Sequence, residues 1–191
     1  MGPSDEELVQ RARDGDRDAF RELVERYQRK IASLALGVLR DREDALDVVQ
    51  ETFARAYQSL GGFKGDAGFY TWVYRIAMNL CIDHQRREAK TPLAALDSRN
   101  GGAADDRLGT LPDAAEHGDP YRHARDVEIA RGLSRAIGEL TPEHRAVIVL
   151  REVEGLSYEE ISQVLDCPKG TVMSRLHYAR RQLQERLRGL R

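Results

Sequence analysis

The acidic side chains of the segment 41–60 are the first candidates for chemistry. Asp44, Asp47 and Glu51 stand three and four residues apart, so a helix places their carboxylates near one another. Such a group suits a divalent cation or acid–base catalysis, as in a small metal-dependent hydrolase. The sequence offers no second carboxylate cluster and no pair of histidines to complete this site. We therefore predict no catalytic residue, no metal and no cofactor.

The cysteines give no stronger signal. Cys81 precedes His84 by a two-residue gap, which alone is a weak ligand pair, and Cys167 has no base nearby in the sequence. Two cysteines are too few for a disulfide framework, and we expect both to be packing residues in a reducing compartment.

The segment 155–181 has the pattern of a DNA-binding helix-turn-helix. Ser157 and Glu160 form a capping box that starts a first helix, which we expect to end near Leu165. Pro168 suits the first position of a second helix. About 100° per residue places one set of apolar side chains on the buried side: Val172, Leu176, Ala179 and Leu183. The opposite side can enter a major groove: Thr171, Ser174, His177, Tyr178 and Arg181.

Charge supports this interpretation over an ordinary solvated surface helix. Residues 166–191 carry seven Lys+Arg against two Asp+Glu, whereas residues 126–165 have a net charge of −4. The whole chain has a net charge of −2, so nucleic acid can be attracted only by a local basic face. Arg175 and Arg180, at the borders of that face, suit phosphates.

The segment 69–87 predicts a helix with a second surface of interest. Phe69, Val73, Ile76 and Leu80 repeat at core spacing. Aromatic, amide and guanidinium groups fall on an adjacent wall: Trp72, Arg75, Asn79 and Arg86. Bases of single-stranded or melting DNA can stack and hydrogen-bond on such a wall, although Trp72 as a half-buried core residue explains it equally well. A glycine-containing loop, 63–68, precedes the wall.

The segment 41–60 also predicts a docking surface. Leu46, Val49, Phe53, Ala56 and Leu60 have core spacing, which leaves the opposite side exposed. That side carries Asp44, Asp47, Val48, Glu51 and Arg55. An exposed Val48 among carboxylates is typical of a protein-binding face, but solvated charge with one harmless apolar residue is the simpler alternative.

The periodicity predicts an all-α protein of two helical domains. Helices are expected at 5–14, 16–39, 41–60, 69–87, 127–140 and 142–153, before the helix-turn-helix. Periodicity is lost from 89 to about 119, where glycines, prolines and acidic residues indicate a linker. The predicted division is a first domain at 1–88, a flexible linker at 89–125 and a second domain at 126–191. No apolar run approaches the ~20 residues that cross a bilayer, so we expect no membrane insertion and a cytoplasmic location.

Several motifs in fixed order resemble one known family. They are DALDVVQETF at 44–53, FYTWVYRIAMN at 69–79, GLSYEEI at 155–161 and GTVMSRL at 170–176. The chain closely resembles the extracytoplasmic function (ECF) sigma factors of bacterial RNA polymerase, and within them the sigma-E-like members. The resemblance implies domains 2 and 4 of a sigma factor, which binds core polymerase, recognises the −35 and −10 promoter elements and helps to open the DNA, in a stress response. It also implies an anti-sigma partner.

The resemblance assigns roles to residues of this chain. Binding to the clamp coiled coil of the β′ subunit would involve Asp44, Asp47, Val48, Gln50, Glu51 and Arg55. The −10 element would contact Phe63, Lys64, Tyr70, Trp72, Arg75, Asn79, Arg86 and Arg87. The −35 element would contact Lys169, Thr171, Met173, Ser174, Arg175, His177, Tyr178, Arg180 and Arg181, while the second domain meets the β flap. Met173 and Tyr178 stand where relatives often carry Lys or Arg, so the −35 preference is expected to differ.

The linker bears on how the domains are arranged. Elements about 25 base pairs apart are separated by roughly 85 Å of DNA, and the extended linker reaches roughly 120 Å. We expect the free protein to hold its domains closer together than this. The main alternative function is a dimeric helix-turn-helix regulator that is not a polymerase subunit, which self-association and symmetric DNA sites would reveal.

Overall fold

The computed structural model describes residues 2–90, 129 and 132–188, and all regular secondary structure in these ranges is helical. The all-α prediction is confirmed. The helices are α1 (Asp5–Arg13), α2 (Arg17–Leu39), α3 (Arg42–Ser59), the short η1 (Leu60–Gly62), α4 (Phe69–Lys90), α6 (Pro142–Ile148), the π-helical η3 (Val149–Val153), α7 (Tyr158–Leu165) and α8 (Lys169–Leu187). Residues 132–138 are also helical. Most of the predicted linker, and part of the helix predicted at 127–140, lie outside the described residues.

Capping residues explain where α1, α2, α3 and α6 begin. Ser4 and Glu7 form a reciprocal capping box at α1. Asp16 and Asp41 each accept two backbone N–H groups at the starts of α2 and α3. Thr141 caps α6, with Pro142 in the first turn. These caps satisfy backbone donors that otherwise lack partners at a helix start, so the boundaries agree closely with the predicted ones.

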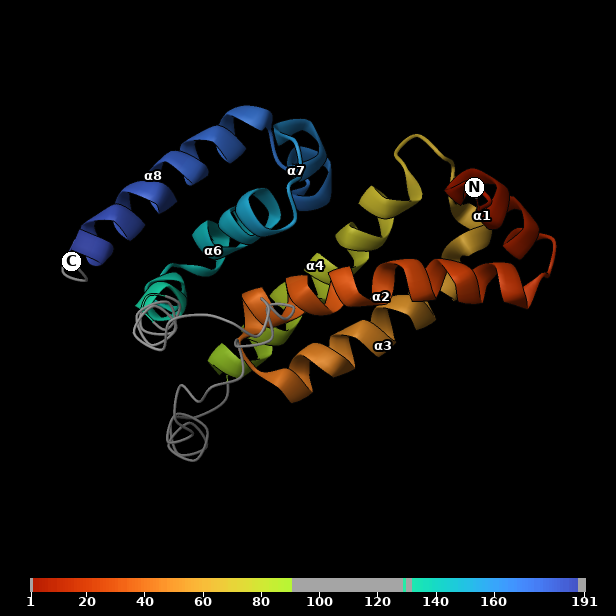
Figure 1. The fold of residues 1–191 in the computed structure, drawn as a ribbon, viewed down its shortest axis with the longest axis horizontal. Helices are drawn as coiled ribbons and strands as arrows, with labels where there is room; N and C mark the ends of the chain where they lie inside the picture. Colours follow the sequence, from red (N-terminus) through yellow and green to blue (C-terminus); the bar gives the residue numbers. More distant parts are fainter. Residues whose placement is uncertain (1, 91–128, 130–131, 189–191) are drawn as a thin grey trace, which may run out of the picture.

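The helices form two units, which lie against each other in Figure 1. The N-terminal unit is α1–α4, with α2 packed between α1, α3 and α4. The C-terminal unit is residues 132–188, in which α8 packs on α6 and α7. α7 packs on α4, and η3 and α6 pack on α2. Buried side chains from both units belong to one continuous hydrophobic core. The two domains therefore lie close together, as expected. In the described ranges, no helix has the length and apolarity needed to span a bilayer.

Candidate functional site

Short-range hydrogen bonds fix the start of α7 and the turn that leads into α8. The Ser157 hydroxyl accepts the Glu160 N–H at 3.2 Å, and the Ser157 N–H donates to the Glu160 carboxylate at 2.7 Å, as the capping box predicted. Asp166 ends α7 with a left-handed φ of 49°. The Ser162 hydroxyl donates to the Cys167 carbonyl at 2.7 Å. α8 begins at Lys169, one residue later than predicted, so Pro168 is its N-cap and not its first residue.

The outer surface of α8 carries the residues predicted to contact the −35 element, and we call it the α8 face. Val172, Leu176 and Ala179 are buried as predicted, which fixes the rotation of the helix. The exposed members are Lys169, Met173, Ser174, His177, Tyr178, Arg180 and Arg181, while Thr171 and Arg175 are half-buried. Met173 and Tyr178 are 53% and 55% exposed. Two large side chains with extensive apolar surface thus point outward from α8.

The cations of the α8 face have acidic neighbours on the surface. Arg180 donates to the Glu152 carboxylate at 2.6 Å, and this bond raises the pKa of the guanidinium. Lys169 lies 3.2 Å from Glu159. Exposed pairs of this kind stabilise a fold by about 0–1 kcal/mol. They can therefore exchange for phosphate contacts at little cost.

The residues predicted to contact the −10 element lie on α4 and the loop before it, and we call this surface the α4 wall. Phe63 packs against Trp72 with ring centroids 5.0 Å apart, and Phe69 lies 5.7 Å from Trp72. Trp72 is half-buried, which fits both interpretations of its role. Lys64, Arg75, Asn79, Arg86 and Arg87 are exposed. The wall combines an aromatic cluster with exposed hydrogen-bonding groups along one helix.

Tyr70 joins this wall to α2. Its ring lies 4.6 Å from that of Tyr74 and 6.1 Å from that of Tyr27, measured between centroids. The Lys30 ammonium lies 5.8 Å from the Tyr70 ring centroid, a cation–π distance. Burial raises the pKa of Tyr70 to about 12, so its hydroxyl stays protonated and can donate near neutral pH.

The exposed face of α3 agrees with the predicted one at Asp47, Glu51 and Arg55 and differs at its first turns. Val48 is 5% exposed and packs in the core, so its predicted exposure was wrong. Leu46, assigned to the core from its spacing, is 48% exposed. The face that solvent reaches carries Leu46, Asp47, Gln50, Glu51 and Arg55, and we call it the α3 face. Arg55 pairs with Glu51 at 2.7 Å along the helix.

Asp44 belongs to a different group of side chains. It is half-buried and lies 3.1 Å from His84 Nε2 of α4, while Glu88 lies 3.8 Å from His84 Nδ1. Ligand atoms of these three residues fall within 4.8 Å of one another, close enough for a cation. The carboxylates, however, face different nitrogens of the ring, an arrangement that suits polar contacts of the imidazole better than one shared ion. The sequence analysis missed His84 as the partner of Asp44.

The α4 wall and the turn before α8 border a common cleft of about 530 Å³. Asp66, Ala67 and Arg75 line it from the N-terminal unit, and residues 162, 163 and 166–168 line it from the C-terminal unit. Arg75 lies 3.4 Å from Asp166 across the cleft. The structure therefore brings the predicted −10 surface beside the helix-turn-helix, which the sequence analysis did not foresee.

Comparison with known proteins gives one consistent family. The model of sigma-70 region 2 matches residues 23–91, and that of sigma-70 region 4 matches residues 130–183. The ECF RNA polymerase sigma-E factor of Haemophilus influenzae is 37% identical over 98% of this chain and 97% of its own length. The RNA polymerase sigma-H factor of Pseudomonas aeruginosa is 38% identical, over 97% of this chain and 95% of its own.

A solved structure agrees. CnrH, determined in complex with the cytosolic domain of CnrY, superposes with a TM-score of 0.69 and 26% identity, covering 98% of this chain and 99% of CnrH. The chain belongs to the ECF sigma factors of RNA polymerase.

Proposed function

We propose that the protein binds core RNA polymerase through the α3 face, recognises the −10 element through the α4 wall and the −35 element through the α8 face, and promotes DNA opening. It contributes binding energy and strand separation, while the polymerase performs catalysis. The observation that carries the proposal is the α4 wall, where exposed Arg75 and Asn79 lie on the helix that also holds Trp72 against Phe63. An unstacked base finds an aromatic surface, a hydrogen-bonding amide and a phosphate-binding cation there.

The α3 face supports the docking role without Val48. Leu46 supplies an exposed apolar side chain among Asp47, Gln50 and Glu51. A partly apolar patch ringed by polar groups is typical of a protein-binding surface. We propose that this face meets the β′ clamp coiled coil and that the C-terminal unit meets the β flap.

The α8 face suits duplex DNA. Its cations can bind phosphates, and the apolar Met173 and Tyr178 can contact thymine methyl groups, which gives a −35 preference distinct from that of a Lys- or Arg-rich helix. We propose a cytoplasmic stress-response role and an anti-sigma partner that covers both docking surfaces. CnrH, solved with the cytosolic domain of CnrY, supports the existence of such a partner.

Run-off transcription with purified core polymerase and a promoter library tests the function directly. The full-length protein should direct initiation at defined start sites, and core alone should not. Failure to bind core, or self-association on symmetric DNA sites, would instead favour the dimeric regulator.

Three exposed variants test the individual surfaces. Glu51→Lys should weaken core binding, whereas Glu25→Lys, the same charge change on α2, should not.

Asn79→Ala should reduce permanganate-detected DNA opening while core affinity is retained, with Gln58→Ala as control. Arg181→Ala should lower the salt dependence of promoter binding by about one counterion, with Arg29→Ala as control.

A further inference from the structure

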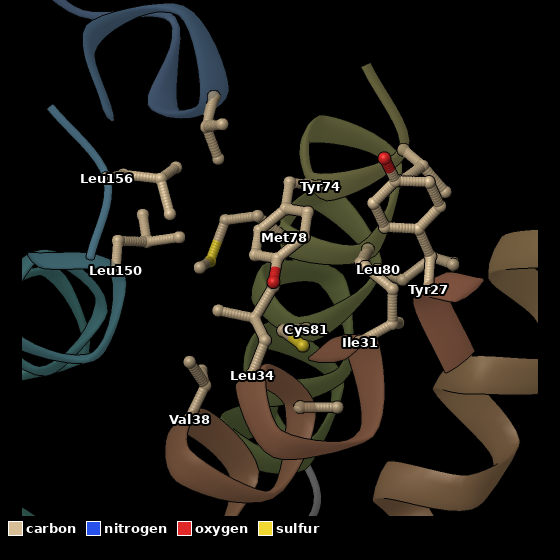
Figure 2. Close-up of a cluster of buried hydrophobic side chains, with 14 of the residues drawn as sticks. Tyr27, Ile31, Leu34, Val38, Tyr74, Met78, Leu80, Cys81, Leu150 and Leu156 are labelled. Carbon is tan, nitrogen blue, oxygen red and sulfur yellow. The ribbon is translucent and has the colours of Figure 1, made fainter. Parts of the chain in front are cut away.

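The centre of the surface shared by the two units is apolar and buried. Tyr74 and Met78 of α4 are both 0% exposed, and Leu150 and Leu156 of the C-terminal unit are 0% and 1% exposed. Figure 2 shows Leu150 and Leu156 facing Tyr74 and Met78, with Leu34 and Val38 of α2 beside them. Separating the units would expose these side chains to water, so the hydrophobic effect favours the closed arrangement.

A buried hydroxyl and a carboxylate reinforce the contact. The Tyr74 hydroxyl donates to Glu154 Oε2 at 2.5 Å, between α4 and the end of η3. Burial raises the pKa of Tyr74, so the hydroxyl keeps the proton it donates. A hydrogen bond to a charged acceptor is stronger than a neutral one. The bond links residues 80 positions apart and closes the contact near α7.

The end of α2 makes a second polar contact. Arg145 of α6 donates to the Val38 carbonyl at 2.8 Å and to the Gly138 and Leu140 carbonyls at 2.7 and 3.1 Å. Carbonyl groups in the last turn of a helix lack intrahelical partners, and a cation is favourable there. Arg145 thus ties the C-terminal unit to α2.

A glycine inside α2 allows the two units to approach closely. A Cβ placed on Gly37 would lie 3.0 and 3.1 Å from the two γ-carbons of Val149. Glycine inside a helix is less stable than alanine. At Gly37 the missing side chain makes room for η3.

This closed arrangement is incompatible with binding both promoter elements at once. Arg75 of the α4 wall lies 3.4 Å from Asp166, at the turn that leads into the α8 face. The −10 and −35 elements are separated by roughly 85 Å of straight DNA. We propose that Gly37, Val38 and Tyr74, clasped by Val149, Arg145 and Glu154, hold free sigma factor closed, and that core polymerase must open this clasp before the promoter is bound.

The inference rests on the proposed division of promoter contacts between the units. The closed state is the resting state, and core binds the open state with higher affinity. The observed affinity for core is then reduced by the fraction of protein that is closed. Weakening the clasp should therefore increase the rate of holoenzyme assembly.

A disulfide across the clasp is the sharpest test. The Cβ position at Gly37 lies 3.7 Å from Val149 Cβ, within the range of about 3.5–4.5 Å found in disulfides. Gly37→Cys with Val149→Cys, in a Cys167→Ser background, should form this bond readily in the free protein. Cysteines in preassembled holoenzyme should stay reduced. The oxidised protein should give at least tenfold less promoter-directed transcript than the same protein after reduction, and each single-cysteine variant should be insensitive to oxidation.

A second variant keeps the test independent of the disulfide. Tyr74→Phe removes the donor to Glu154, which is half-buried and can regain water. The open fraction, and with it the association rate with core, should rise about tenfold, equivalent to 1.4 kcal/mol. Tyr27→Phe is the matched control, because it breaks a hydroxyl bond to Asp5 within the N-terminal unit and should leave that rate unchanged.

The outcomes separate this inference from the proposed function. No disulfide in the free protein, equal disulfide formation in holoenzyme, full transcription by the oxidised form, or equal association rates for Tyr74→Phe and wild type would each overturn the clasp. If wild-type protein directs no transcription, the proposed function fails, and disulfide formation with and without core still decides the clasp.

Discussion

Replacing Gly37 by alanine sets two effects of opposite sign against each other. Alanine inside a helix is favoured over glycine by about 1 kcal/mol. The added methyl group, however, meets the Val149 γ-carbons at 3.0 and 3.1 Å, well inside the roughly 3.5–4.0 Å optimum for carbon–carbon contact. Val149 is 1% exposed, and a β-branched side chain has little rotational freedom in a helix.

The steric effect should be the larger of the two. Overpacking of a well-packed core typically costs about 1–3 kcal/mol. We therefore expect Gly37→Ala to lower the free energy of unfolding by about 0–2 kcal/mol despite its better helix propensity. Gly170→Ala is the matched control, because Gly170 also lies in a helix but a Cβ there meets nothing within 4 Å. That control should raise the free energy of unfolding by up to about 1 kcal/mol.

Urea unfolding of the full-length variants, followed by helical circular dichroism, measures both changes. Val149→Ala removes the two γ-carbons, so adding it to Gly37→Ala should recover about 1–2 kcal/mol of coupling in a double-mutant cycle. Stabilisation of the protein by Gly37→Ala to the same extent as by Gly170→Ala would show that Val149 does not pack on α2 in solution, and would refute this reasoning.

Three further predictions concern single contacts. Ser157→Ala should cost about 1 kcal/mol in urea unfolding, because the first turn of α7 loses its cap; Ser33→Ala, at an exposed site within α2, should cost much less. Arg145→Lys should cost about 2 kcal/mol, because a lysine cannot reproduce the forked donation to several carbonyls; an unchanged unfolding midpoint would contradict this. Burial raises the pKa of Cys81 to about 12 from an ordinary value near 8.5. The contribution of the buried neutral thiol to the free energy of unfolding is therefore fully present below pH 8.5 and is lost as the pH rises through 12. Iodoacetamide at pH 8 should therefore modify Cys81 only in urea, as read by mass spectrometry, and equal labelling of native protein would exclude this burial.

The sequence predicted helix starts and the rotation of α8 because both depend on local chemistry. Ser157 and Glu160 stand three residues apart, and their capping box forms within one turn of helix. Val172, Leu176 and Ala179 recur at helical spacing, so one rotation of α8 buries all three. Information within a few residues was sufficient in both cases.

The rotation of α3 could not be predicted in the same way. Its sequence carries two overlapping apolar stripes, one through Leu46 and Val49 and another through Ala45 and Val48. The second stripe is buried against α2 and α4, together with Thr52, whose hydroxyl donates to the Val48 carbonyl at 2.6 Å. Small residues and a self-satisfied threonine allow a closer helix approach than leucine does. Counting hydrophobic residues favours the larger side chains and therefore misassigned Leu46 and Val48, although Phe53, Ala56 and Leu60 are buried as predicted.

The contact between the units depends on pairs of residues too far apart for any periodicity to relate. Taken by themselves, Tyr74 has the character of a core aromatic residue and Glu154 that of a surface acid. Only the fold brings them together as hydrogen-bond partners. A local signal for this contact, which the sequence analysis did not use, is Gly37: a glycine in the last two turns of a long helix lowers the stability of that helix unless another backbone or side chain needs the space. That space is filled by η3, so the local cost in α2 is offset by contact between the units. A residue that is unfavourable within its own helix thus indicates where a second part of the chain is docked.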